Sequence, residues 1–177
     1  MYQAKELGRN RFRLYRAEMN DQASRRLSLE SSLRKALTQD ELFMVYQPKV
    51  DILHGAVTGF EALVRWERGG EIISPMEFIP LAEETGIILP LGRQVLDMTC
   101  REAPAFFEAG AEGMRASVNL SPRQFVQPDL VDMIARILET RGVPPERLDL
   151  EITETAIAAD LDGAVYKLDR LRDMGAQ

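Results

Sequence analysis

Residues 59–67, GFEALVRWE, have the apolar composition of a buried β-strand but include two ionisable residues, Glu61 and Arg65. Ionised side chains are costly to bury unless they are paired with an opposite charge or bind a metal or ligand. Side chains alternate between the two faces of a strand. The apolar face then consists of Phe60, Ala62, Val64 and Trp66, and the opposite face of Glu61, Leu63 and Arg65. The segment therefore predicts a strand with one face in the core and a second face available for polar contacts.

The segment before it, residues 41–53 (ELFMVYQPKVDIL), also predicts a strand, and His54-Gly55 predicts a two-residue turn between the two strands. A connection this short permits only an antiparallel hairpin, because a parallel crossover needs a dozen residues or more. The chain is therefore expected to open its sheet with an antiparallel pair.

Helices and strands alternate after this hairpin. Residues 74–86 predict a helix with Ser74 as N-cap, Glu77 completing a capping box and Gly86 as its stop. Further helices are predicted at about residues 29–39, 89–109, 129–141 and 161–174, and further strands at 114–121 and 147–155. This order predicts an α/β fold with a mostly parallel sheet.

The two later strands repeat the polarity of the strand at residues 59–67, because Asn119 and Glu151 alternate with apolar residues. In a flat antiparallel sheet this polar face would be turned toward solvent. Parallel strands with intervening helices favour a barrel instead, in which such residues form a site at the carboxyl ends of the strands. Glu61, Asn119 and Glu151 are therefore predicted to converge, and the alternative is that they are ordinary surface or paired polar residues.

Two carboxylates and an amide oxygen are hard ligands, which suit Mg²⁺, Mn²⁺ or Ca²⁺ and not zinc. Arg65 lies about 13 Å along the strand from Glu61 by the usual rise per residue, too far for a salt bridge but suitable for a phosphate of an extended ligand. These charges indicate phosphoryl chemistry of an unspecified kind.

The composition excludes several other classes. The 177 residues carry a formal net charge of −6, which argues against a nucleic-acid polymer as partner. One histidine and one cysteine (Cys100) supply neither a zinc site nor a Ser-His-Asp triad, and they predict a reducing, cytoplasmic location without disulfides. The sequence contains neither a signal peptide nor an apolar run of about 18 residues, so we expect no membrane segment in it.

The chain also resembles a known family. Its residues contain, in order, VYQPKVD, FEALVRW, SPMEFIPLAEETGII, SVNLSPRQF and LEITET. Together these motifs resemble the EAL domains, the cyclic-di-GMP phosphodiesterases of bacteria. The resemblance implies a modified TIM barrel with an antiparallel first strand, and hydrolysis of cyclic di-GMP to linear pGpG with Mg²⁺ or Mn²⁺. A homodimer of EAL domains is a further possible partnership.

The same resemblance assigns roles to individual residues. It implies that Glu61, Asn119 and Glu151 are metal ligands, with the two glutamates counted as catalytic. It also implies that Gln47, Leu63 and Arg65 contact the dinucleotide. Glu154 matches a glutamate that anchors a loop near the metals, and it is predicted as a third catalytic group.

Residues 1–16 resemble the last helix and strand of a GGDEF domain, so a GGDEF domain is expected to precede this chain in a longer parent protein. Residues 17–28 are predicted as a linker or connecting helix, and residues 29–177 as the first half of an EAL barrel. The family's Asp-Asp strand would follow Gln177, so this chain alone is expected to be inactive. Lys167 and Asp169 are expected to be solvated charges that do not replace those groups.

Three functions remain open from the sequence. The first is a cyclic-di-GMP phosphodiesterase, of which this chain is a part. The second is a catalytically inactive EAL domain that senses cyclic di-GMP. The third is a protein-interaction module in which the helix at residues 29–39 and the N-terminal segment dock neighbouring domains.

Overall fold

The structure is a computed structural model that describes residues 17–110, 113–153, 157 and 161–177. The helices are α2 (Ala17–Ala36), α3 (Pro75–Thr85), α4 (Ile88–Ala109), α5 (Pro122–Phe125), α6 (Leu130–Arg141) and α8 (Leu161–Met174), with a short 3-10 helix at Pro145–Arg147. The strands are β1 (Leu42–Val50), β2 (Val57–Arg68), β3 (Glu71–Ile73), β4 (Arg115–Leu120) and β5 (Leu148–Ile152). The elements thus alternate as predicted after the opening hairpin.

The strands form one sheet in the order β1-β2-β4-β5, with β3 added to the end of β2. β1 and β2 are antiparallel, whereas the β2–β4 and β4–β5 pairs are parallel. This confirms the predicted mixture of one antiparallel pair and parallel strands that are connected by helices. β3 was not predicted, because a segment of three residues has too little pattern to distinguish it from a loop.

The connection between β1 and β2 differs from the predicted two-residue turn. Val50 pairs with Val57, and the residues between them form a wider loop. The Asp51 carboxylate accepts hydrogen bonds from the backbone N–H groups of Leu53 and His54 (2.8 and 2.9 Å), which closes the loop around the aspartate. The prediction considered only the glycine signal and missed this Asx-type turn. The hairpin is antiparallel as expected.

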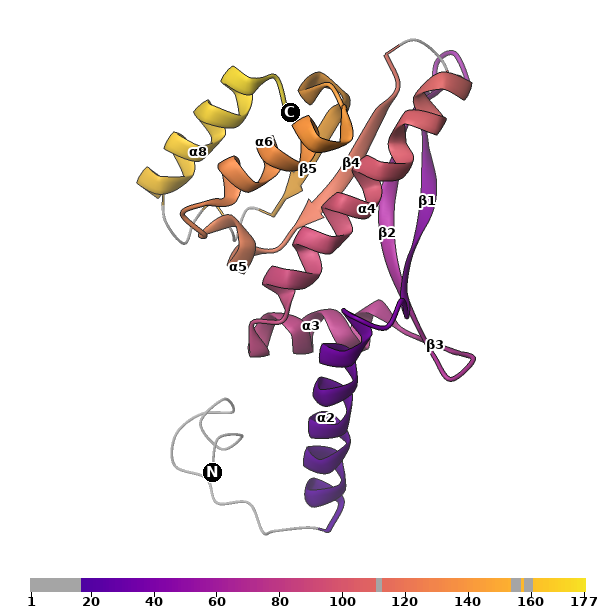
Figure 1. Ribbon diagram of the computed structural model, residues 1–177, viewed down its shortest axis with the longest axis vertical. Helices are drawn as coiled ribbons and strands as arrows, with labels where there is room; N and C mark the ends of the chain where they lie inside the picture. The colour runs from indigo at the N-terminus through magenta and orange to yellow at the C-terminus, as the bar shows by residue number, and fades with distance from the viewer. Residues whose placement is uncertain (1–16, 111–112, 154–156, 158–160) are drawn as a thin grey trace.

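The helices pack on the apolar face of the sheet. Trp66 is fully buried and meets Phe78 of α3 edge to face, with ring centroids 5.6 Å apart. Its indole N–H donates to the Glu41 carboxylate (2.9 Å). Figure 1 shows α4, α6 and α8 gathered to one side of the strands, and α4 packs against β4 and β1. The apolar face predicted for β2 is therefore the core face.

α2 is one continuous helix that joins the predicted connecting segment to the helix predicted at residues 29–39, which ends earlier than predicted, at Ala36. Leu33 and Ala36 near its end are fully buried. The rest of the helix projects away from the body beyond α3, as Figure 1 shows. Arg26 pairs with Glu84 of α3 and ties the projecting part to that helix.

Two predicted details of the helices are corrected by the structure. Ser74 precedes α3, but its side chain makes no capping hydrogen bond, so the capping box predicted with Glu77 is absent. Gly86 does end α3, with a left-handed φ of 81°. Lys167 of α8 is buried and not solvated, because its ammonium donates to the Phe125 carbonyl (2.7 Å) and lies over the Phe125 ring.

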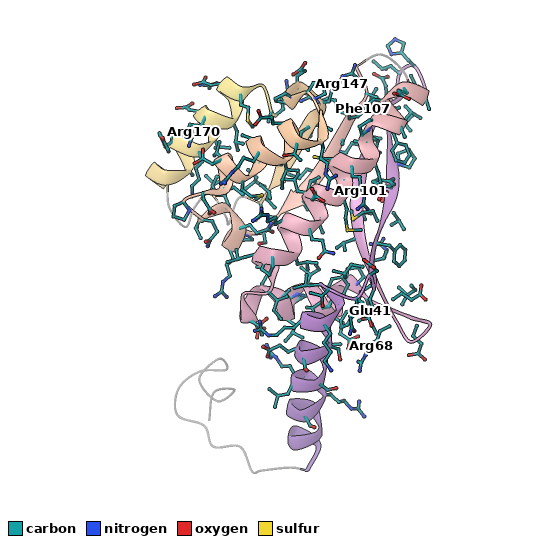
Figure 2. The ribbon with its side chains drawn as sticks, in the orientation of Figure 1. Glu41, Arg68, Arg101, Phe107, Arg147 and Arg170 are labelled. Atoms are coloured by element: carbon teal, nitrogen blue, oxygen red, sulfur yellow. The ribbon has the colours of Figure 1, made fainter. Side chains whose placement is uncertain are left out.

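Arg147 connects neighbouring segments near the amino ends of the parallel strands β4 and β5. Arg147 donates to the Met114 carbonyl (3.0 Å) and lies over the Phe107 ring of α4, 5.4 Å from its centroid. Figure 2 shows these two residues together, far from Glu41 and Arg68 at the opposite end of β2.

In the part of the chain that the structure describes, no helix is long and apolar enough to cross a membrane.

The outer edge of β5 is partly occupied by the residues after α8. The Gln177 N–H donates to the Leu148 carbonyl (3.1 Å), and the Leu150 N–H donates to the Gln177 carbonyl (2.6 Å). Backbone groups on an open edge otherwise favour association with another strand. The chain therefore returns to its own sheet directly after α8.

Candidate functional site

The register of the strands aligns polar residues across the face of the sheet that the helices leave uncovered. Gln47 of β1 is opposite Glu61 of β2, and Glu61 is opposite Ser117 of β4. In the next row toward the carboxyl ends of the parallel strands, Asn119 is opposite Glu151 of β5. The three residues predicted to converge therefore come from three neighbouring strands.

Asn119 and Glu61 are in direct contact. The Asn119 side-chain amide donates a hydrogen bond to Glu61 Oε1 at 2.6 Å. Asn119 is exposed and Glu61 is half-buried, so both are reachable from solvent. This contact joins β2 and β4 on the polar face, as the sequence predicted.

Glu151 has a different partner, which the sequence analysis missed. The Lys49 ammonium lies 2.5 Å from Glu151 Oε1 and 2.5 Å from Ser117 Oγ. Lys49 is on β1, opposite Gly59. The alternation of β1 places it on the face of Gln47, a signal that could have identified it.

The contact between Lys49 and Glu151 shows that the sheet is curved. β1 and β5 are separated by β2 and β4, so they would lie about 14 Å apart in a flat sheet. Side chains stand roughly perpendicular to a flat sheet, and two residues that far apart would not meet. The polar face is therefore concave, as expected for the interior of a barrel and not for a flat, solvated sheet.

A second ion pair lies beside the first one. Arg115 Nε, on β4 opposite Gly59, is 2.7 Å from Asp149 Oδ1 on β5. Ser117 connects the two pairs, because it accepts from Lys49 and lies 3.5 Å from Asp149 Oδ2. The floor of the concave face thus contains alternating cations and carboxylates.

A cavity of about 410 Å³ opens at the carboxyl ends of the parallel strands. Asn119, Glu151, Leu63 and Arg65 line it, together with apolar residues of α3 and α4. The Arg65 guanidinium donates to the Val64 carbonyl (2.9 Å). Of the other predicted residues, Gln47 and Glu61 do not line this cavity, although Glu61 contacts Asn119. Glu154 lies outside the described residues.

The short helix α5 fixes the rim of the cavity directly after β4. Ser121 caps it by accepting from the Gln124 N–H (3.3 Å), and Gln124 Oε1 accepts from the Ser121 N–H (3.1 Å). The chain therefore has a capping box at Ser121 and Gln124, which was not predicted, and lacks the one predicted at Ser74 and Glu77. Gly92 of α4 makes room for the capping box at Ser121, because a side-chain carbon there would collide with the Gln124 amide.

The oxygen atoms of Glu61, Asn119 and Glu151 are of the types that bind hard divalent ions. Glu61 and Glu151 supply carboxylates and Asn119 an amide oxygen, the ligand types preferred by Mg²⁺ and Mn²⁺. Mg²⁺ often binds through one or two carboxylates and completes its coordination with water and substrate phosphates. Within the described residues, no group of three or more His, Cys, Asp and Glu side chains is placed to hold a metal ion.

Known proteins share this architecture. The EAL domain profile matches residues 30–177. An uncharacterized signaling protein of Caulobacter vibrioides is 42% identical over 180 residues, which cover 100% of this chain and 22% of that protein. The bifunctional diguanylate cyclase/cyclic di-GMP phosphodiesterase MucR of Pseudomonas aeruginosa is 39% identical over 176 residues, which cover 99% of this chain and 26% of MucR.

A solved structure agrees with these matches. The PaMucR phosphodiesterase in complex with c-di-GMP has a TM-score of 0.80 and 39% identity to this chain, covering 84% of this chain and 61% of the solved one. The likeness confirms the predicted fold class, an α/β sheet with the antiparallel first strand of a modified TIM barrel. The chain spans about a quarter of the length of the two curated relatives.

Proposed function

The chain belongs to the EAL domain family, and on that premise we propose that the protein hydrolyses cyclic di-GMP to linear pGpG with Mg²⁺ or Mn²⁺. One observation carries the proposal. Glu61, Asn119 and Glu151 come from three neighbouring strands and lie together on the concave face, beside a cavity that Arg65 also lines. The activity belongs to the whole protein, and residues 1–177 by themselves are expected to turn over little.

In this proposal Glu61, Asn119 and Glu151 hold the divalent ions. When bound, such ions lower the pKa of a water molecule and neutralise charge on the phosphate that it attacks. To hold an ion, Asn119 would present its amide oxygen, and Glu61 and Glu151 would exchange their present hydrogen-bond donors, Asn119 and Lys49, for it. Glu154 is proposed to support the same centre from the segment after β5.

The remaining predicted residues orient the dinucleotide. Arg65 lines the cavity and carries a guanidinium, which can bind two phosphate oxygens at once. Leu63, on the same strand and face, offers apolar contact beside it. Gln47 is exposed opposite Glu61 and supplies a neutral amide at the edge of the site. Arg65 thus sets phosphate affinity, and Glu61 with Asn119 sets the metal position.

The test is to incubate the full-length protein with cyclic di-GMP and Mg²⁺ or Mn²⁺ and to separate the products by ion-pair chromatography. We expect pGpG to accumulate with either ion and none to form when EDTA is present. Bound cyclic di-GMP without any product, with metal supplied, would contradict the proposal.

That contrary result would favour the second candidate, a sensor that binds cyclic di-GMP without cleaving it. The contact of Lys49 with Glu151 supports this alternative, because it neutralises one of the two metal-binding carboxylates. Product analysis with Mg²⁺ or Mn²⁺ supplied distinguishes the two functions, since the sensor retains cyclic di-GMP and the enzyme converts it to pGpG.

The wider organisation is also part of the proposal. In this proposal a GGDEF domain precedes α2, and the EAL domain begins at about residue 29, within that helix. α2 therefore connects the two domains. MucR supports this arrangement, because its name includes diguanylate cyclase and it aligns with 99% of this chain. We place the domain in the cytoplasm, where it can pair with a second EAL domain. Sedimentation of the full-length protein tests the pairing.

A further inference from the structure

Lys49 contacts one of the proposed metal ligands, Glu151, although it is not itself among the residues assigned to the site. It extends from β1 past Gly59, which presents no side chain in its path, and its ammonium reaches β4 and β5. Gly59 is required there for a separate reason, because a side-chain carbon would lie 2.6 Å from the Arg115 carbonyl oxygen. Close packing of β2 and β4 therefore also leaves the route of Lys49 open.

The charges of the concave face are nearly balanced. Around Glu61 and Glu151 the carboxylates are Glu61, Asp149 and Glu151 and the cations are Lys49 and Arg115, with Arg65 further along the same face of β2. Arg115 is paired with Asp149, and Lys49 with Glu151. Within the part of the chain that the structure describes, the Glu61 carboxylate accepts a hydrogen bond only from the neutral Asn119 amide. A divalent ion that enters this face must therefore compete with a cation that the chain itself supplies.

The contact of Lys49 with Glu151 is close but open to exchange. The two side chains keep 39% and 40% of their surfaces exposed, so an ion and its waters can reach Glu151. Ser117 accepts a second hydrogen bond from the same ammonium and can retain Lys49 when Glu151 turns away. The ammonium would then remain close enough to the bound ion to repel it.

We infer that Lys49 is a tethered cation that weakens divalent-metal binding at Glu151, and so determines the metal affinity of this site. The inference rests on the proposed metal-binding role of Glu61, Asn119 and Glu151. Lys49 acts through Glu151 and contacts neither substrate nor reacting atoms, which makes it a positioning residue. Its effect is on the concentration of metal that the protein needs.

The experiment measures Mn²⁺ binding by electron paramagnetic resonance on the full-length protein without nucleotide. Lys49→Met removes the charge and keeps most of the side-chain length, and Lys49→Gln is a second variant whose neutral amide can still hydrogen-bond. Lys49→Arg keeps the charge. Lys35→Met removes an exposed charge in the last turn of α2 and serves as the matched control.

We expect Lys49→Met and Lys49→Gln to bind Mn²⁺ about tenfold more tightly than the unaltered protein, a difference of about 1.4 kcal/mol. Lys49→Arg and Lys35→Met should leave the affinity unchanged. Equal or weaker binding in both neutral variants overturns the inference, because Lys49 would then only hold Glu151 in place. Absence of Mn²⁺ binding in every protein overturns it as well. A tenfold gain without any hydrolysis of cyclic di-GMP supports the inference and refutes the proposed function.

Discussion

Asn119 Nδ2 lies 2.6 Å from Glu61 Oε1, although the two residues are not opposite one another in the sheet. Glu61 is opposite Ser117, and Asn119 is opposite Glu151. The hydrogen bond therefore runs diagonally between two rows of the polar face and connects them. It holds a carboxylate and an amide within reach of one ion.

Replacing Glu61 by glutamine is expected to weaken Mn²⁺ binding at least tenfold and to reduce pGpG formation in parallel. The neutral amide is nearly isosteric, but it removes the charge that a hard cation requires. Isothermal titration with Mn²⁺ and a product assay on the full-length protein measure the two effects. Glu67→Gln, at the exposed end of the same strand, should change neither. Equal effects of both substitutions would refute a specific role for Glu61.

Arg65→Met is expected to raise KM for cyclic di-GMP about tenfold or more and to change kcat less. The guanidinium lines the cavity, and a hydrogen bond to a charged group contributes about 1.5–3 kcal/mol. Steady-state kinetics over a range of substrate concentrations separate the two parameters. Arg68→Met is the control, because Arg68 is exposed near the end of β2. If Arg65→Met reduced only kcat, a role in phosphate binding would be excluded.

Gly92→Ala is expected to destabilise the protein by about 1–2 kcal/mol, although alanine is the better helix former by about 1 kcal/mol. The added carbon collides with the Gln124 amide and breaks the capping box of α5. Urea denaturation followed by circular dichroism gives the change in free energy of unfolding. In a Gln124→Ala background the same substitution should be neutral or stabilising. A loss that persists in that background would show that the collision is not its cause.

The stability of the protein is expected to fall as the pH rises from about 9 toward 12. Burial, together with the nearby Asp97 carboxylate, raises the pKa of the Cys100 thiol from 9.0 to about 12. Because the folded pKa is the higher one, the stabilisation is complete below the unfolded pKa. It is lost as the pH rises toward the folded pKa, with a slope of at most about 1.4 kcal/mol per unit.

Urea titrations at pH 8 and pH 10.5 measure this loss, and Cys100→Ala should reduce it. Part of the loss should remain in that variant, because burial and a hydrogen bond to Glu102 also raise the pKa of Tyr46. An identical pH dependence with and without Cys100 would refute the assignment to the thiol.

The sequence predicted the parts of the fold that depend on periodic patterns. The alternating faces of β2, β4 and β5 placed Glu61, Asn119 and Glu151 together, because a two-residue period fixes which face a side chain occupies. The antiparallel start followed from a short connection. The conformation of that connection could not be predicted from Gly55 alone, because the loop is closed by hydrogen bonds from backbone N–H groups to the Asp51 side chain.

Charge pairing across the sheet was the part that the sequence could not supply. Lys49 and Glu151 are 102 positions apart, and they meet only because four strands curve around a concave face. The environment of Lys167 on α8 was likewise not predictable from the sequence. A lysine on a helix predicts a solvated charge, yet Lys167 is buried, donates to the Phe125 carbonyl and lies over the Phe125 ring. Both contacts depend on tertiary geometry, which local patterns do not encode.

The two backbone hydrogen bonds of Gln177 fix its register against the outer edge of β5 and therefore which face of the sheet each following side chain would occupy. They flank Asp149, so Gln177 is level with Asp149 in a parallel arrangement. In a chain that continues in this direction, the residue two positions further on comes level with Glu151, and the next alternate one with Thr153. Those two positions, and not the one between them, would face the ions proposed at Glu61, Asn119 and Glu151. Acidic residues there would extend the metal site, whereas a shift by one position would turn them into the core.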